Sequence, residues 1–350
     1  MLALQAQTPE ALARAIGAKL PEARKIVSAV HRGSWKAGAV LQGVRRMVID
    51  AAARHEVPAL EVRAEARSAL DPFVKLSLAS HDGAVFETVR IPLERAGRFS
   101  ACVSSQVGCA LGCVFCATGR LGLSRNLEVW EIIEQVRVVR ATLGPGQRVH
   151  GVVFQGMGEP LANLDRVVEA IRIMSEPSAL AIDSRAITVC TAGVPSGIRR
   201  LARELPKVRL GLSISSARRD VRRRLMPVDK ANPLDEVIEA AVEHARATGL
   251  APMWAVTPLE GINDTEDDAR ALADLARDFE SRADVRPRLS VVPYNRICDA
   301  GDDPFSRGEV SRFIDHLLAS GLRPHLRYSG GSDVAAACGQ LAARGLRPVS

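Results

Sequence analysis

The chain has 350 residues, of which 47% are hydrophobic and 25% are charged, which is the composition of a globular protein that can bury a sizeable core. It contains no run of eighteen apolar residues and no basic segment followed by an apolar stretch near its start, so we expect a cytoplasmic protein without membrane contact. The formal net charge of +7 permits a polyanionic partner but does not require one.

The first sixty residues predict a small helical module. Thr8 and Pro9 combine an N-cap residue with a proline at the first helical position. Apolar residues then recur at helical spacing between residues 26 and 30, and again between residues 40 and 49. We therefore expect a helical domain over residues 1–60.

Residues 73–91 predict a β-hairpin. Two runs of alternating apolar and polar residues flank Asp82 and Gly83, a pair that is typical of a tight turn between strands. We expect this hairpin to form a linker over residues 61–98, which joins the helical domain to the rest of the chain.

From about residue 100 the sequence alternates between short apolar runs and amphipathic helices, such as those at 164–174 and 234–242. The apolar runs lie at 100–107, 150–155, 186–190, 207–214, 251–257 and 287–293. This alternation predicts an α/β fold with a parallel sheet, either doubly wound or a closed or partly open (β/α) barrel. In both architectures ligands bind at the carboxyl ends of the strands.

Four of the seven cysteines lie within fifteen positions, directly after the first of these strands. Cys109, Cys113 and Cys116 have the spacing C-x3-C-x2-C, and Cys102 lies seven residues upstream. Three thiolates from one loop can hold three irons of a [4Fe-4S] cluster and leave the fourth iron open to a substrate or cofactor. The alternative is a structural zinc site with Cys102 as the fourth ligand, in a non-catalytic RNA-binding protein.

The cysteine loop resembles that of the radical S-adenosylmethionine (SAM) enzymes, and the longer string CVSSQVGCALGCVFCATG (102–119) is similar to the RlmN/Cfr family of ribosomal RNA adenosine methyltransferases. The resemblance extends to ETVRIP (87–92), FQGMGEPLANLD (154–165) and AAACGQL (335–341). It implies a partial (β/α)6 radical SAM barrel over residues 99–350, preceded by the β-hairpin extension and by a helical module like those that bind RNA.

The resemblance also implies an activity and its cofactors. It predicts methylation of an adenine ring carbon in 23S rRNA and perhaps in tRNA, with C2 favoured over C8. One [4Fe-4S] cluster, held by the three loop cysteines, and SAM would supply the radical chemistry, and flavodoxin or ferredoxin would donate the electron. A radical SAM enzyme with a different substrate stays open as an alternative.

Three further residues match catalytic positions of the family. Cys338 corresponds to the cysteine that carries the methyl group as S-methylcysteine, and Cys102 to the cysteine that resolves the covalent RNA intermediate through a transient disulfide with Cys338. Glu87 corresponds to the residue that accepts the proton from the adenine carbon. Cys298 is expected only to pack.

The family's contacts to SAM correspond to a second set of residues, in the GMGEP segment and at the ends of later strands. At two places the sequence departs from the family: Cys190 replaces a serine, and Ser213-Ile214-Ser215 replaces Ser-Leu-His. A packing role for Cys190 stays open. The predicted SAM-contacting residues are Gly158, Glu159, Cys190, Ser213, Ile214, Ser215 and Asn295.

The residues expected to contact RNA follow the family pattern less closely than those of the proposed SAM site. The basic run ARRDVRRRL contains Arg218, Arg219, Arg222, Arg223 and Arg224, which either bind phosphates or form a solvated helix face. Near the carboxyl end Gly330 stands where the family has an arginine, and YNR (294–296) replaces Trp-Asn-Pro. Both departures lie where RNA selection is expected.

Overall fold

The computed structural model describes residues 1–297, 303 and 305–342. A sheet of ten strands is its main element, and its strands follow one another in the order β1-β2-β3-β4-β7-β8-β9-β10-β11-β12. The prediction for Cys298 falls outside the described residues. Within the described residues no helix has the length and apolar character needed to cross a membrane.

The amino-terminal segment folds into helices α1 (Pro9–Ile16), α2 (Leu20–His31) and α3 (Arg46–Ala52). The Thr8 hydroxyl accepts a hydrogen bond from the Ala11 amide at 3.2 Å, which confirms the predicted N-cap. The helix predicted over residues 40–49 was placed too early, because α3 begins only at Arg46. Val40 is 83% exposed, whereas Leu41 and Val44 are partly buried against the helical core without forming part of a helix.

The predicted hairpin is confirmed by strands β2 (Val74–Ala79) and β3 (Val85–Pro92), which pair antiparallel. Strand β1 (Glu61–Arg67) pairs with the outer edge of β2, and β4 (Arg98–Cys102) pairs antiparallel with β3. The hairpin therefore extends the sheet from the first barrel strand, and it places β3, which carries Glu87, beside β4, which ends at Cys102.

From β4 onward every neighbouring pair of strands is parallel and follows chain order. The strands are β7 (Arg148–Phe154), β8 (Ile187–Thr191), β9 (Arg209–Ser213), β10 (Met253–Val256), β11 (Arg288–Val291) and β12 (His325–Leu326). A doubly wound sheet reverses its strand order at a switch point, and this sheet does not. The prediction of a partly open (β/α) barrel is therefore confirmed.

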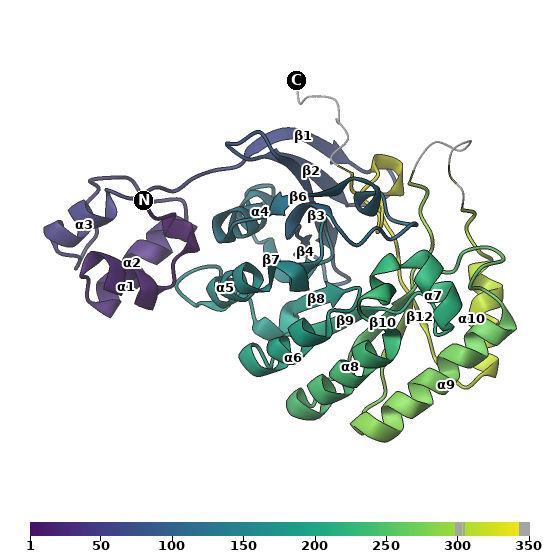
Figure 1. The fold of residues 1–350 in the computed structure, drawn as a ribbon. Coiled ribbons are helices and arrows are strands. Elements are labelled where there is room, and N and C mark those ends of the chain that lie inside the picture. Colours follow the sequence, from purple (N-terminus) through teal and green to yellow (C-terminus); the bar gives the residue numbers. More distant parts are fainter. Residues whose placement is uncertain (298–302, 304, 343–350) are drawn as a thin grey trace.

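Helices cover the outside of the barrel strands, as Figure 1 shows. They are α4 (Val129–Ala141), α5 (Leu164–Ser175), α6 (Pro195–Glu204), α8 (Leu234–Thr248), α9 (Glu266–Ala283) and α10 (Val310–Ala319). The apolar stripes predicted at 164–174 and 234–242 are the buried faces of α5 and α8. Burial of these stripes against the sheet forms the main core.

One predicted strand was too long. The run 100–107 leaves the sheet after Cys102, because the hydrogen-bonding groups of Ser104 are already paired elsewhere. Its amide donates to Gln135 Oε1 at 2.7 Å, and its hydroxyl donates to the Glu87 carbonyl oxygen at 2.6 Å. Residues Gln106–Cys109 then form β5, which pairs antiparallel with β6 (Gly122–Asn126) in a separate two-stranded sheet. The short strand β12 was not predicted at all. How the chain divides into domains stays a prediction.

The amino-terminal helices contact the barrel through α4. Arg137 donates to the Val30 carbonyl oxygen at 3.3 Å, and His31 is buried at the end of α2. Burial, assisted by the positive charges of Arg137 and Arg140, lowers the pKa of His31 to about 4. The docked module therefore favours the neutral imidazole of His31.

We predict that protonation of His31 weakens the fold in mild acid. The pKa of His31 rises from about 4 to its ordinary 6.5 on unfolding, so the unfolded chain binds an extra proton between these values and stability falls as the pH drops through them. The loss through this residue amounts to about 2 kcal/mol between pH 7 and pH 5.

Urea unfolding at the two pH values measures this loss. His31→Leu should reduce it, while His325→Leu, at an exposed position of β12, should leave it unchanged. Because burial also lowers the pKa of His244 to about 4, part of the pH dependence should remain in His31→Leu. An unaltered pH dependence in that variant would contradict the assignment.

Candidate functional site

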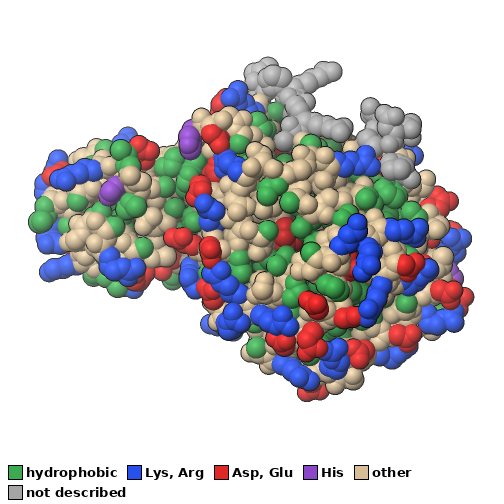
Figure 2. Space-filling model, viewed as in Figure 1, with side chains coloured by type: hydrophobic (Ala, Val, Ile, Leu, Met, Phe, Trp, Pro, Cys, Tyr) green, Lys and Arg blue, Asp and Glu red, His purple; other side chains and the backbone are tan. Residues whose placement is uncertain are grey.

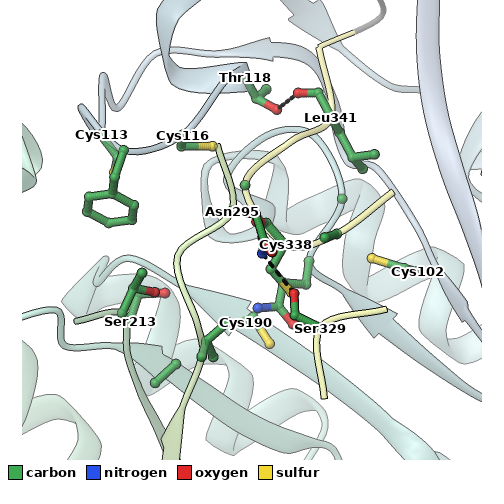
Figure 3. A pocket seen from close by; sticks show the side chains of 18 of the residues that line it. Cys102, Cys113, Cys116, Thr118, Cys190, Ser213, Asn295, Ser329, Cys338 and Leu341 are labelled. Carbon is green, nitrogen blue, oxygen red and sulfur yellow. Dashed lines mark hydrogen bonds between the residues drawn. The ribbon is translucent and has the colours of Figure 1, made fainter. Parts of the chain in front are cut away.

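A cavity of about 220 Å³ lies at the carboxyl ends of the barrel strands, and Figure 3 shows part of its lining. It brings together eleven of the thirteen predicted site residues: Cys102, Cys109, Cys113, Cys116, Gly158, Glu159, Cys190, Ser213, Ser215, Asn295 and Cys338. Glu87 and Ile214 do not line it. Parallel strands deliver their carboxyl ends to one edge, which is why residues so distant in sequence meet here.

The cysteine loop enters the cavity between β5 and the short 3-10 helix η2 (Thr118–Arg120). Its middle is held by the amide of Val114, which donates to the Leu225 carbonyl oxygen of α7 (Arg219–Leu225) at 3.1 Å. Burial, followed by repulsion from neighbouring thiolates, raises the pKa of Cys113 to about 12, and mainly burial raises that of Cys109 to about 11. These thiols gather in an apolar setting that disfavours their charged form.

Such a donor set suits an iron-sulfur cluster, whose irons would stabilise the thiolates. In a cluster each thiolate binds a different iron, so the three sulfurs need not converge on one point. Across residues 1–297, 303 and 305–342, no three His, Cys, Asp or Glu side chains are grouped to hold a single metal ion.

Gly158 and Glu159 follow β7 at the wall of the cavity. Gly158 has a φ of +97°, and a Cβ atom there would lie 2.5 Å from the Cβ of Gln106, so only glycine fits. Burial raises the pKa of Glu159, although its carboxylate accepts hydrogen bonds from the Leu161 and Ala192 amides, each at 2.9 Å. A buried carboxylate fixed in this way is suited to an ammonium group.

Residues Ser213, Ile214 and Ser215 stand at the end of β9. Ser213 and Ser215 line the cavity, whereas the side chain of Ile214 is fully buried in the core. Ser215 has a φ of +57°, an uncommon conformation for a serine, and its carbonyl oxygen accepts a hydrogen bond from Asn263 Nδ2 at 2.6 Å. The backbone of this turn is therefore held in one position beside the cavity.

Arg222 of α7 fixes the same turn from behind. Its guanidinium donates to the carbonyl oxygens of Ser213 at 2.8 Å and Ala192 at 2.7 Å, and also to that of Ile214. Its Nε donates to Asp229 Oδ1 at 3.0 Å, and both side chains are buried. Both sequence-based interpretations of Arg222 are wrong: it contacts neither RNA phosphate nor solvent, because the backbone carbonyls at the ends of β8 and β9 use its donors.

The other arginines of the run are exposed, and Figure 2 shows Lys and Arg side chains gathered where Figure 1 places α7. Arg218 contacts Asp268 at 3.4 Å, and Arg219 pairs with Asp235. Arg223 and Arg224 border a shallow depression together with Lys230. For these exposed residues, phosphate binding stays a prediction.

The segment that carries Cys338 crosses the mouth of the barrel and is tied down on both sides. Asn295 Nδ2 donates to the Cys338 carbonyl oxygen at 3.1 Å and to Ser329 Oγ at 2.8 Å. Next to the cysteine loop, the Ala117 amide donates to the Gly339 carbonyl oxygen at 2.8 Å. Cys338 therefore faces both the cysteine loop and the strand ends.

Glu87 lies just beyond the cavity wall. Its carboxylate pairs with Lys75 at 3.1 Å and accepts a hydrogen bond from the Ala342 amide at 2.9 Å, directly after the Cys338 segment. Its neighbour Thr88 donates to the Cys102 carbonyl oxygen at 2.7 Å. Glu87 thus contacts the segment of Cys338 and adjoins Cys102, although it does not open into the cavity itself.

The departure at Gly330 has a local cause. A Cβ atom at this position would lie 2.6 Å from Asp71 Oδ2 and even closer to the ring of Phe73. Asp71 is occupied here by hydrogen bonds from the Tyr328 hydroxyl at 2.8 Å and the Gly331 amide at 2.9 Å. The arginine found elsewhere in the family has no room in this arrangement.

Sequence reasoning missed several residues that shape the site. Gln106 supports the Glu159 amide through its side-chain oxygen at 2.8 Å, and Asn263 holds the turn at Ser215. Arg327 keeps the first arginine of the family's pattern and lines the cavity together with Cys338, although no site role was assigned to it from the sequence. Only Arg222 left a detectable signal: Val221, Leu225 and Met226 place position 222 at the apolar face of α7, where a charged side chain must find internal partners.

Comparisons with known proteins agree with this geometry. A family model described as the radical SAM superfamily matches residues 103–276. A protein of Sorangium cellulosum, named as a probable RNA methyltransferase, is 57% identical over an alignment of 355 positions. The alignment covers 95% of this chain and 90% of the relative. A dual-specificity RNA methyltransferase RlmN of Syntrophobacter fumaroxidans is 38% identical over 94% of this chain and 93% of the relative.

Among solved structures, the crystal structure of a radical SAM methyltransferase from Sphaerobacter thermophilus superimposes with a TM-score of 0.87 at 32% identity, and the match covers 98% of this chain and 100% of the other. Fold and site together define a radical SAM enzyme, a class that uses a [4Fe-4S] cluster and SAM. Within that class, the chain belongs to the family of SAM-dependent RNA methyltransferases that includes RlmN. The resemblance drawn from the sequence is confirmed, while the roles of the individual site residues stay predictions.

We predict that loss of the Arg222 guanidinium destabilises the barrel strongly. Arg222→Met leaves Asp229 as a buried charge and three carbonyl oxygens without their donor, so the free energy of unfolding should fall by about 3–5 kcal/mol. Arg223→Met is the matched control, because Arg223 is 57% exposed and lies 3.7 Å from the same aspartate. It should cost less than about 1 kcal/mol. Equal losses in urea unfolding would disprove the special role of Arg222.

Proposed function

We propose that this enzyme methylates an adenine ring carbon, C2 in preference to C8, in 23S rRNA and in tRNA. The observation that carries the proposal is the meeting of Cys102 and Cys338 in one cavity with the cysteine loop, although these two residues lie 236 positions apart (338 − 102). A reaction that needs a methyl-carrying sulfur, a second sulfur and a radical source requires this combination. Relatives named as dual-specificity RNA methyltransferases support two classes of RNA target.

Cys109, Cys113 and Cys116 would hold the cluster. Glu159 would bind the ammonium group of SAM, and the backbone near Gly158 would lie against its methionine end. Cys190, Ser213, Ile214, Ser215 and Asn295 complete the proposed SAM contacts, with Ile214 acting only through its backbone. When bound, the cluster and SAM supply a carbon radical, which is needed because an adenine ring carbon is not a nucleophile towards a methyl sulfonium.

In the proposed reaction Cys338 presents its methylated sulfur to the adenine. Cys102 then attacks that sulfur and releases the product as a Cys102–Cys338 disulfide forms. Neither Cys102 nor Cys338 is bonded to another described cysteine, which is the arrangement that such a cycle starts from. Burial raises the pKa of Cys102, so its thiolate would form only when a neighbouring group takes its proton. Glu87 would accept the proton that leaves the adenine carbon.

The RNA would approach over the mouth of the barrel. The exposed arginines of α7 are suited to phosphate contacts by their charge. They stand close to the proposed cluster ligands, because α7 also supports the cysteine loop through Leu225. The target base would have to leave its stack to reach the cavity. A flavodoxin or ferredoxin would supply the electron.

Metal analysis tests the cofactor part of the proposal. Anaerobically reconstituted protein should be brown and contain about four irons per chain. Cys113→Ala should lose most of this iron, whereas Cys338→Ala should retain it, because Cys338 is not a proposed cluster ligand. Colourless protein with stoichiometric zinc would contradict the assignment.

A deletion strain tests the substrate. Mass spectrometry of its ribosomal and transfer RNA should show the loss of a methyladenosine, which the wild-type gene restores and the Cys338→Ala gene does not. Retention of iron by the variant shows that the failure is chemical rather than a folding defect. If the deletion strain keeps all its methyladenosines, the proposed substrate class is wrong.

A further inference from the structure

Three thiols and one guanidinium share the part of the cavity nearest to β4 and β8. Cys102 ends β4, Cys190 lies in β8, and Cys338 lies in the segment that crosses the barrel mouth; Arg327 precedes that segment. Figure 3 shows the side chains of the three cysteines around the same space. The proposed reaction gives Cys190 a contact to SAM and leaves its sulfur chemistry unused.

Strand geometry decides which of these thiols can pair. Strand β7 lies between β4 and β8, with Cys102 opposite Val153 and Val153 opposite Thr188. Neighbouring strands are about 4.8 Å apart, so the backbones of Cys102 and Cys190 are separated by roughly 10 Å or more. A disulfide needs Cα atoms about 4.4–6.8 Å apart, which excludes a bond between Cys102 and Cys190.

Cys338 is not subject to that constraint. It stands in an irregular segment rather than in the sheet, and it is half-buried. Cys338 lines the same cavity as Cys102 and Cys190, and Figure 3 shows the three side chains around one space. Burial raises the pKa of both partner thiols, that of Cys190 to about 12. Cys338 therefore has two candidate partners, which exclude one another because a sulfur forms only one disulfide.

Arg327 lines the cavity together with all three thiols. Within the described part of the chain its guanidinium has no hydrogen-bond acceptor and no ion-pair partner, although it lines the cavity. Burial opposes its charge, but Cys338, Cys190 and Cys102 together raise its pKa. Its positive charge opposes the effect of burial on Cys102 and Cys190 and favours their thiolates, which are the form that attacks another sulfur.

We propose that Cys190 is a second resolving thiol, which can take Cys338 into a disulfide in place of Cys102. The inference rests on the proposed function of Cys338 as the methyl carrier. The Cys190 thiolate attacks the Cys338 sulfur of the covalent RNA adduct, and the S–S bond forms as the bond from that sulfur to the methylene carbon breaks. The bonding pair stays on the carbon, which takes up a proton and becomes the product methyl group.

This step is balanced without an outside oxidant, because the two sulfurs are oxidised to a disulfide while the carbon is reduced. A serine, which the family carries at this position, cannot perform it. The replacement of serine by Cys190 therefore adds a second route out of the covalent intermediate.

Disulfide mapping tests the pairing without RNA. The full-length, anaerobically reconstituted protein is oxidised with glutathione disulfide, alkylated, digested and analysed by mass spectrometry. A Cys190–Cys338 peptide is expected in Cys102→Ser, and a Cys102–Cys338 peptide in Cys190→Ser, which restores the family's serine. Neither should form in the double variant. Absence of the Cys190–Cys338 peptide from Cys102→Ser overturns the proposal.

Turnover with RNA, SAM and a reductant tests the role. Cys102→Ser should accumulate severalfold less covalent RNA–protein adduct on a denaturing gel than Cys102→Ser/Cys190→Ser. Equal adduct in the two variants, with normal product from the wild type, overturns the role of Cys190 alone. If the wild type forms no product and no variant forms an adduct, the proposed function has failed and the resolving role falls with it.

Discussion

The contact on which the cavity depends most is the buried guanidinium of Arg222. This one side chain donates to carbonyl oxygens at the ends of β8 and β9 and pairs with Asp229. Backbone at the end of a strand has lost its ladder partners, so its carbonyls need donors from elsewhere. Arg222 supplies them, and the helix that carries it also supports the cysteine loop at Val114. The proposed SAM contacts and the proposed cluster ligands therefore share a single support.

The segment that carries Cys338 completes the site, because it contacts the end of the barrel, the cysteine loop region and strand β3. Asn295 holds the backbone of Cys338, Thr118 of the cysteine loop region donates to the Leu341 carbonyl oxygen at 2.5 Å, and Glu87 accepts from Ala342. None of these bonds is strong alone, with about 1 kcal/mol as the typical net contribution. Together they convert a segment with little regular structure into a fixed wall of the cavity, which a methyl-carrying sulfur needs if it is to meet its acceptor in one orientation.

Much of the fold followed from local pattern. The N-cap at Thr8, the hairpin around Asp82 and the buried stripe of α5 are set by neighbouring residues, so sequence alone predicts them. The strand over 100–107 failed because Ser104 takes its partners from Gln135 and Glu87, which no local pattern reveals. Arg222 was misjudged for the same reason: a run of arginines suggests solvent, and only the packed structure shows that one of them turns inward. The grouping of the site residues was anticipated through family motifs, and the arginine motif that retains Arg327 gave no sign that this residue lines the cavity.

The crowding of Gly330 by Phe73 and Asp71 connects two stretches of sequence that are more than 250 positions apart. Positions 73 and 330 cannot change independently. A long side chain at position 330 needs a smaller neighbour in the loop between β1 and β2. The ring of Phe73, in turn, needs a residue without a Cβ atom at position 330. Among natural homologues the two positions should therefore covary, with arginine at the later one accompanied by a reduced side chain at the earlier one.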